Sequence, residues 1–473
     1  MCGSEESGEI EWLALNLATT NPWMKGFLFT YLMTIGGTVI APFRPFWGLL
    51  VYLAFAILKP DILWEFSVPR GYYSRIVMIA VLVGWALSGF GHWRFGRARL
   101  LVVALFGYMI ASCVSAYAAA DQQLAWDQTQ ATAKTLLPVL VGLTLLDSTE
   151  RLRQVAWVIV LSQGFLAYEF NRSYYDGYNR LVINGFAGMD EKTVAIGMVV
   201  GASVAVFLGL SSKRWWQQAL ALALAIPMMH VPLFVFSRGG MMALLVSGAV
   251  AFWFIPKRPM HLGVVVVAIL LGFRLAGPEV RAKFMSSFSE EEQGRGASGG
   301  SRLVLWGQAW ETLTARPLIG VGPRHWGRWA QSHYEWRGEK EAHNTWLQAG
   351  AELGFPGLIA LLLIFVSPLF LLLPVARADP RLTGADGDLA RMVVCGLAGF
   401  FVASQFITVY GVEMPYFVAM MGGGLLRVRS TALVQDAASV GATSPASAAA
   451  GSPAINGQAP GALGVVARRS LIT

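Results

Sequence analysis

The feature that most limits how this chain can fold is a series of long apolar stretches that recurs along most of its length. A helix crosses the hydrocarbon core of a bilayer with about 20 mostly apolar residues. We identify 13 candidate spans: 26–41, 46–58, 76–90, 100–119, 131–146, 155–170, 194–210, 219–236, 241–255, 262–275, 358–373, 392–410 and 416–426. The first two are short, and if they formed one broken element the count would be 12. The sequence therefore predicts an all-α integral membrane protein with about 12–13 transmembrane helices.

One polar segment, residues 277–350, interrupts this pattern. Of its 74 residues 17 are charged, whereas 14% of the whole chain is charged. It also contains three of the six histidines and six of the 17 tryptophans. Apolar spans need no such insertion to cross a bilayer, so we expect the chemistry where this loop meets the membrane. The chain is thereby divided into transmembrane helices over 1–276, a loop with short helices over 277–350, and transmembrane helices over 351–429.

The positive charges predict which way the chain faces. They cluster in short loops at alternate span ends, namely Arg94–Arg99, Arg151–Arg153, Lys213–Arg214, Lys257–Arg258, Arg377–Arg381 and Arg427–Arg429. Such loops face the cytoplasm, which places residues 277–350 on the outer side. The net charge of +8 is explained in this way without a nucleic-acid partner. Residues 430–473 are rich in Ala, Ser, Gly and Pro, and we expect a disordered cytoplasmic tail.

The N-terminus, the cysteines and the acidic residues argue against a cleavable signal peptide, disulfides and a metal site. Four glutamates among the first 11 residues predict no cleavable signal peptide, and three cysteines form no disulfide or metal-ligand pattern. No aspartate occurs between Asp190 and Asp379, so the loop lacks an Asp-x-Asp metal motif. The pairs Asp61/Glu65 and Asp121/Asp127 in other outer loops could serve a metal-dependent enzyme, but outer loops carry acids routinely. We expect neither metal nor cofactor.

The polar loop is expected to contain two helices. Ser301 would cap the first, which carries an apolar stripe of Trp306, Ala309, Trp310 and Leu313. The Gly/Pro turn from Arg316 to Pro323 would end it. The second would cover Lys340–Leu353, with His343, Leu347 and Gly350 on one face, and would end at Gly354–Gly357.

Three residues could carry chemistry at the outer face. Arg238 follows a span and precedes Gly239, so it is either an interface anchor or, with backbone N–H groups at a helix start, an anion site. Arg302 begins the first loop helix; taken alone it is a solvated charge. His343 is more often structural than catalytic by its type, yet its pKa near neutrality makes it the best general base in the loop. Asn344 would support the local backbone.

Together these pieces resemble the O-antigen ligase and polymerase superfamily, the bacterial proteins that share the Wzy-type C-terminal region. The matching set runs from Ser237 to Gly357 and comprises Ser237-Arg238-Gly239-Gly240, Ser301-Arg302, Arg316-Pro317-Leu318-Ile319-Gly320-Val321-Gly322, His343-Asn344 and Glu352-Leu353-Gly354. Many members have an asparagine after the aspartate at Asp190, whereas this chain has Glu191-Lys192, so we carry no role onto Asp190.

The resemblance implies a glycosyltransferase of the bacterial inner membrane. Its donor would be an undecaprenyl-pyrophosphate-linked glycan and its acceptor a hydroxyl of lipid A–core or protein, at the periplasmic face and without metal or nucleotide. Arg238, Gly239 and Arg302 would bind the pyrophosphate, His343 would act on the acceptor hydroxyl, and Arg316 would be a further supporting residue.

Three alternatives remain open from the sequence. One is a receptor-like scaffold whose loop binds a partner, which the set of histidine and arginine residues disfavours. A polymerase would share the fold and arginines but would use another lipid-linked repeat unit as acceptor. A polysaccharide or lipid transporter would need charged groups within the spans, where Glu169 and His230 are the notable exceptions to an almost uncharged interior.

Overall fold

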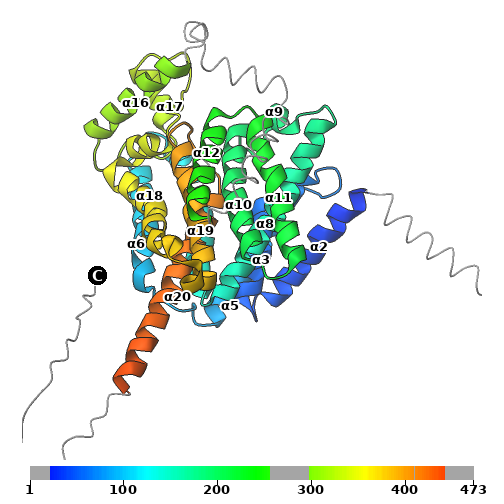
Figure 1. The fold of residues 1–473 in the computed structure, drawn as a ribbon. Coiled ribbons are helices and arrows are strands. Elements are labelled where there is room, and N and C mark those ends of the chain that lie inside the picture. The colour runs from blue at the N-terminus through cyan, green and yellow to red at the C-terminus, as the bar shows by residue number, and fades with distance from the viewer. Residues whose placement is uncertain (1–21, 256–297, 410, 443–473) are drawn as a thin grey trace, which may run out of the picture. The chain divides into compact units, whose positions relative to one another are not determined.

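The computed structural model describes residues 22–255, 298–409 and 411–442 (Figure 1). Every regular element in these ranges is a helix, and the only pairing of strand type is an isolated bridge between Phe186 and Met189. The predicted all-α class is confirmed. Five helical segments are long and apolar enough to cross a membrane, namely Pro45–Leu63, Gly96–Tyr117, Glu191–Ser211, Trp215–Phe234 and Thr345–Arg377, and three shorter apolar helices accompany them.

Many helices coincide with predicted spans. Their bounds are α2 Pro22–Ile40, α3 Pro45–Leu58, α4 Pro60–Leu63, α5 Tyr73–Leu87, η1 Gly96–Ala98, α6 Arg99–Tyr117, α7 Gln122–Leu145, α8 Thr149–Tyr175, α9 Arg180–Asn184, α10 Glu191–Ser211, α11 Trp215–Phe234, α12 Arg238–Phe254, α16 Ser298–Ala315, α17 Trp326–His333, α18 Thr345–Arg377, α19 Pro380–Ala403 and α20 Met414–Ala442. Helix α7, however, begins nine residues before its predicted span, and α20 ends 16 residues after its predicted span. The first two spans are separate helices, α2 and α3. The span predicted at 262–275 lies outside the described residues.

Helix α10 forms the centre of the main core. It packs against α8, α11, α12 and α19, and most of its residues are buried. A helix that is apolar on all sides needs such surroundings. Large apolar side chains such as Leu32, Val103 and Leu245 are instead exposed on outer helices, as expected for a surface that meets lipid.

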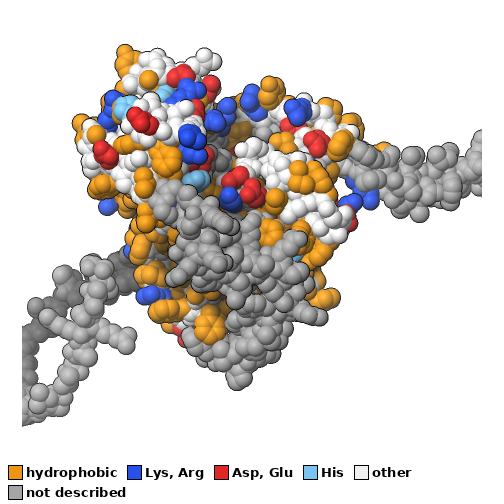
Figure 2. All heavy atoms as spheres, turned by 90° about the horizontal axis from the view of Figure 1, so that it is seen from above, with side chains coloured by type: hydrophobic (Ala, Val, Ile, Leu, Met, Phe, Trp, Pro, Cys, Tyr) orange, Lys and Arg blue, Asp and Glu red, His pale blue; other side chains and the backbone are white. Residues whose placement is uncertain are grey.

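The polar loop forms a small cap with a hydrophobic core of its own. Leu305 and Ala309 of α16 pack with Trp326 and Ala330 of α17 and with Ala351. Figure 1 shows α16 and α17 at the end of the helix layer that also carries α9. Viewed from this end, Figure 2 shows acidic, basic and histidine side chains gathered over the cap and its surroundings.

Several predicted boundaries were wrong. Helix α16 begins at Ser298, so Ser301 lies inside its first turn and is not its cap. Of the predicted stripe, Ala309 and Leu313 are buried, but Trp310 is 51% exposed. The buried face instead includes Leu305, one turn before Ala309, because α17 covers that side of the helix.

The second loop helix begins later than predicted, which changes the setting of His343. Helix α18 starts at Thr345, because the Asn344 side chain accepts hydrogen bonds from the backbone N–H groups of Trp346 and Leu347. His343 therefore precedes the helix and shares no helix face with Leu347. The role expected for Asn344, holding the local backbone, agrees with this cap.

The predicted break at Gly354 is confirmed, and the structure shows what it serves. Gly354 has a φ of 70° inside α18, and beside it the turn after α16 docks on the helix. Backbone N–H groups of Val321 and Gly322 donate to the carbonyl oxygens of Ala351 and Glu352, both at 3.0 Å. A methyl group at Gly320 would lie 2.3 Å from the Glu352 carbonyl. Glycine is needed for this close contact.

Two other predictions at helix ends need correction. Helix α19 ends at Ala403, and residues 404–409 and 411–413 are not helical; we call the segment between the two helices the α19–α20 loop. Helix α20 continues to Ala442, so the segment predicted to be disordered from Ser430 begins as helix. The residues from Thr431 to Val440 include no glycine or proline to end it. The remainder of the tail lies outside the described residues.

Candidate active site

Arg238 stands at the first residue of α12. Ser237 caps this helix, and its Oγ accepts a hydrogen bond from the Gly240 N–H at 3.0 Å. Ser237 is 2% exposed, whereas Arg238 is exposed at the outer end. The cap fixes the helix start, and the Arg238 side chain lies exposed on the first turn of α12.

Arg302, on helix α16 of the cap, lies close enough to Arg238 to be influenced by its charge. One turn after it, the Trp306 ring lies 6.5 Å from the ring of Phe406 in the α19–α20 loop. A methyl group at Gly239 would lie 3.6 Å from Cβ of Phe406. Phe406 is therefore next to the starts of both α12 and α16. Burial lowers the pKa of Arg302, and the positive charge of Arg238 lowers it further.

This arrangement brings two like charges together. Arg302 forms no ion pair or hydrogen bond with any residue in the described ranges. An anion between the two guanidinium groups would relieve their repulsion, and guanidinium groups bind phosphate oxygens in bidentate geometry. The two arginines are 64 positions apart in sequence, so only the fold places them together.

His343 joins this group from the segment before α18. It has a φ of 50°, a left-handed conformation that is uncommon for a residue other than glycine. Burial lowers the pKa of His343 below its ordinary value of 6.5, and the charges of Arg302 and Lys192 lower it further. Neither ring nitrogen forms a hydrogen bond within the described part of the chain. At neutral pH the imidazole is thus uncharged and able to accept a proton.

The start of α10 contributes charges that sequence reasoning did not assign. Asp190 caps this helix by accepting from the Thr193 N–H at 2.8 Å, and its charge opposes the lowering of the His343 pKa. Burial and the negative charge of Asp190 raise the pKa of Glu341. The positive charges of Arg324 and Lys192 lower it. Glu191-Lys192 follow Asp190 where many family members have an asparagine, so the sequence did not predict a site role for these residues.

The backbone on both sides of His343 is held by two polar side chains of α18. Oε1 of Gln348 accepts from the Ala342 N–H at 2.9 Å and from the Thr408 hydroxyl at 2.7 Å. The Thr345 hydroxyl donates to the Ile407 carbonyl at 2.7 Å. The α19–α20 loop, which no motif marked, therefore fixes the position of His343 through its neighbours.

A buried carboxylate extends this support toward the cap. Nε2 of Gln348 donates to Oε1 of Glu352 at 3.1 Å, and the Arg324 N–H donates to Oε2 at 2.9 Å. Glu352 is 4% exposed. The Glu-Leu-Gly motif at 352–354 thus joins α18 to the cap.

Arg316 lies elsewhere in the cap. Its guanidinium carbon is 4.5 Å from the centre of the Trp329 ring, which in turn stacks on His333 at 3.5 Å. Within the described ranges, no hydrogen bond, ion pair or ring contact joins Arg316 to the two arginines or to His343. A supporting role for Arg316 remains a prediction.

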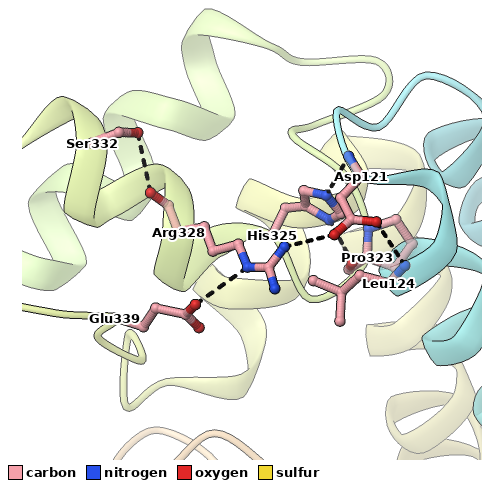
Figure 3. A network of polar contacts seen from close by, with 7 residues as sticks. All are labelled: Asp121, Leu124, Pro323, His325, Arg328, Ser332 and Glu339. Carbon is pink, nitrogen blue, oxygen red and sulfur yellow. Dashed lines mark hydrogen bonds and ion pairs between the residues drawn. The ribbon is translucent and has the colours of Figure 1, made fainter.

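Acidic residues considered as metal ligands have other partners. Asp121 caps α7 and forms an ion pair with Arg328 at 2.7 Å (Figure 3). Glu65 lies 3.6 Å from Arg180. Within the described ranges no three His, Cys, Asp or Glu side chains are grouped as a metal site.

His230 and Glu169, the two titratable residues predicted within the spans, also have neighbouring partners. Nδ1 of His230 lies 2.5 Å from Oδ1 of Asn171, and its ring stacks on Tyr175 with centroids 5.8 Å apart. Glu169 lies 4.0 Å from Arg172 on the same helix.

The fold is that of an all-α membrane protein in which Arg238, Arg302 and His343 influence one another's charge at one end. Residues 223–362 match the family model described as O-antigen ligase, which includes all three predicted site residues. Over this region the chain is similar to that family, and the resemblance seen in its motifs is confirmed there.

A more particular relative is the exopolysaccharide production protein ExoQ of Rhizobium meliloti (strain 1021). It is 29% identical over 126 residues, which cover 25% of this chain and 27% of ExoQ. The matched part is thus about a quarter of either protein. Both comparisons support a glycan-processing membrane enzyme of the ligase or polymerase type.

Proposed function

We propose that this protein is a glycan ligase of the bacterial inner membrane, which transfers a glycan from undecaprenyl pyrophosphate to a hydroxyl of lipid A–core or protein at the periplasmic face. The observation that carries the proposal is the convergence of Arg238, Arg302 and His343 from three separate parts of the chain. Two cations suit a pyrophosphate, and a neutral imidazole beside them suits a hydroxyl that must lose its proton.

The reaction follows from these positions. The acceptor oxygen forms a bond to the anomeric carbon while the bond from that carbon to the pyrophosphate oxygen breaks. The leaving undecaprenyl pyrophosphate takes the electron pair, and its growing charge is stabilised by Arg238 and Arg302. His343 accepts the proton of the hydroxyl. Direct displacement of this kind inverts the anomeric configuration, and it requires neither metal nor nucleotide because pyrophosphate is a good leaving group.

The second candidate is a polymerase that joins lipid-linked repeat units. The match to an exopolysaccharide production protein favours it, and the same residues would serve it. A strain that lacks the gene separates the two. Loss of polymer from lipid A–core, with polymer still present on the lipid carrier, indicates a ligase. A single repeat unit on the core indicates a polymerase.

The proposed orientation has a direct test. Cysteines introduced one at a time in the cap and after Ser430 should differ in labelling by a membrane-impermeant maleimide. We expect cap positions to react in cells with a permeable outer membrane, and tail positions to react only after the inner membrane is opened. Labelling of the tail in intact cells would contradict the topology.

A further inference from the structure

A second polar site lies beside the segment that carries His343. It is a cavity of about 90 Å³ between α6, α7, α18 and the α19–α20 loop. Neither α12 nor α16, which carry the two arginines, contributes to its wall. Thr345 and Gln348, which hold the backbone on both sides of His343, do line it. The cavity therefore lies next to His343, the proposed base, but its walls come from helices other than those that carry Arg238 and Arg302.

Tyr108, Ser112 and Tyr416 line this cavity, and their hydroxyl groups form no hydrogen bond with a residue of the described ranges. Ser112 is 3% exposed, so bulk water does not reach it freely. Buried polar groups in native proteins are almost always hydrogen-bonded. A molecule that enters the cavity would supply the missing partners.

The charge of the lining limits what that molecule can be. No lysine, arginine or histidine lines the cavity, and its one carboxylate is that of Glu352. A phosphate would be repelled there. Groups that both donate and accept hydrogen bonds, as sugar hydroxyls do, match the side chains of Tyr108, Gln128 and Thr132. The chemistry fits a neutral polyhydroxylated ligand.

We propose that this cavity binds a neutral sugar of the acceptor and presents its hydroxyl toward His343. This inference rests on the proposed function, because it takes the ligand to be an acceptor glycan. The donor's pyrophosphate belongs with the two arginines on the other elements. The cavity thus separates acceptor recognition, on α6 and α7, from donor recognition, on α12 and α16.

Variants that remove single hydroxyls test the assignment with little change in shape. Ser112→Ala and Tyr416→Phe each delete one lining hydroxyl, and Ala131→Phe fills the lining from α7, where Ala131 is exposed. Ser203→Ala is the matched control: Ser203 is also buried, but it lies on α10 and its hydroxyl donates to the Val199 carbonyl at 3.1 Å.

The probe is the acceptor glycolipid extracted from a strain that lacks this gene, and its binding to the purified full-length protein is measured without turnover. We expect each hydroxyl deletion to weaken binding about threefold to tenfold, with a larger loss for Ala131→Phe and no change for Ser203→Ala. Binding of the lipid-linked donor should stay at the wild-type level. Unchanged glycolipid binding in all lining variants, or weakened donor binding instead, would overturn the proposal.

A transfer assay with the same two extracts separates this inference from the proposed function. If the wild-type protein yields no product, the proposed function fails, whereas the binding series still decides the cavity. If transfer proceeds and the lining variants bind and use the glycolipid as the wild type does, only the sugar site is wrong.

Discussion

His325 and His343 lie in the same polar loop, 18 positions apart, yet the structure gives them opposite settings. His325 is 5% exposed and both of its ring nitrogens are bonded. The Asp121 N–H donates to Nε2 at 3.0 Å, so Nδ1 carries the proton and donates to the Pro323 carbonyl at 2.9 Å (Figure 3). His343 has no such bonds in the described ranges and faces positive charges.

The arginines near the two histidines differ in the same way. Arg328 has opposite charges on both sides, Asp121 at 2.7 Å and Glu339 at 3.2 Å. Arg302 is influenced instead by the like charge of Arg238. Charges that satisfy one another hold the cap on α7. Charges that repel one another are the ones we propose to bind the donor. The comparison thus separates residues held by local partners from residues of the same type that we propose for catalysis.

The largest expected effect is that of His343→Ala. Loss of a general base typically costs about 10²–10⁴ in rate, so product should nearly disappear while donor binding persists. Purified protein with lipid-linked donor and acceptor provides the measurement. Transfer at close to the wild-type rate would remove His343 from the mechanism and leave the arginines and bound geometry to explain catalysis.

Arg238→Lys and Arg302→Lys should each slow transfer by roughly tenfold to a hundredfold, as expected for lost hydrogen bonds to a charged group. Lysine keeps the charge but loses the bidentate fork. Arg328→Lys, in the paired cluster, is the control and should transfer normally. If both site variants ligate glycan at the wild-type rate with equal protein levels, neither is a donor-site residue.

The pH profile of transfer should also distinguish the two histidines. His343 must be uncharged to accept a proton, and its surroundings lower its pKa. We therefore expect the midpoint of the acid-side decline in transfer to lie below pH 6.5, with transfer falling by up to about tenfold per pH unit beneath that midpoint. A midpoint above pH 6.5 would contradict the assignment.

His325→Ala should act on stability instead. It leaves the Asp121 N–H and the Pro323 carbonyl without their partner, which costs about 1–3 kcal/mol. A lower thermal midpoint in detergent should accompany near-normal transfer at low temperature. If the variant melts as the wild type does but loses transfer by a hundredfold, the roles of the two histidines are reversed.

The smallest effect is expected for Asp121→Asn. The pKa of Asp121 is lowered by its hydrogen bond from Leu124 and by Arg328, so the ionised form stabilises the fold at neutral pH and this contribution is lost as pH falls through the lowered pKa. Because the pair with Arg328 is exposed, its effect is screened by solvent. A small decrease in thermal midpoint at pH 7, absent at strongly acidic pH, checks this. An equal decrease at both pH values would exclude the charge as its cause.

The sequence by itself predicted the helical membrane class, which the structure confirms, the approximate positions of many helices and the candidate site residues, whose roles remain predictions. Spans are readable because lipid requires about 20 apolar residues in a row, and the bounds of α3, α10 and α12 agree with the predicted ones to within a few residues. The residue types Arg238, Arg302 and His343 were readable because phosphate binding and proton transfer need particular side chains.

Only the tertiary structure decided how those residues meet and which histidine is held in place. A start for α18 at Thr345 depends on the Asn344 cap and on contacts from the α19–α20 loop, and this loop is separated from Thr345 by about 60 positions. One partner of His325, the N–H group of Asp121, precedes α7 and lies 204 positions earlier in the chain. Hydrogen bonds and charge effects act over a few ångströms in space, whereas a sequence records only order along the chain.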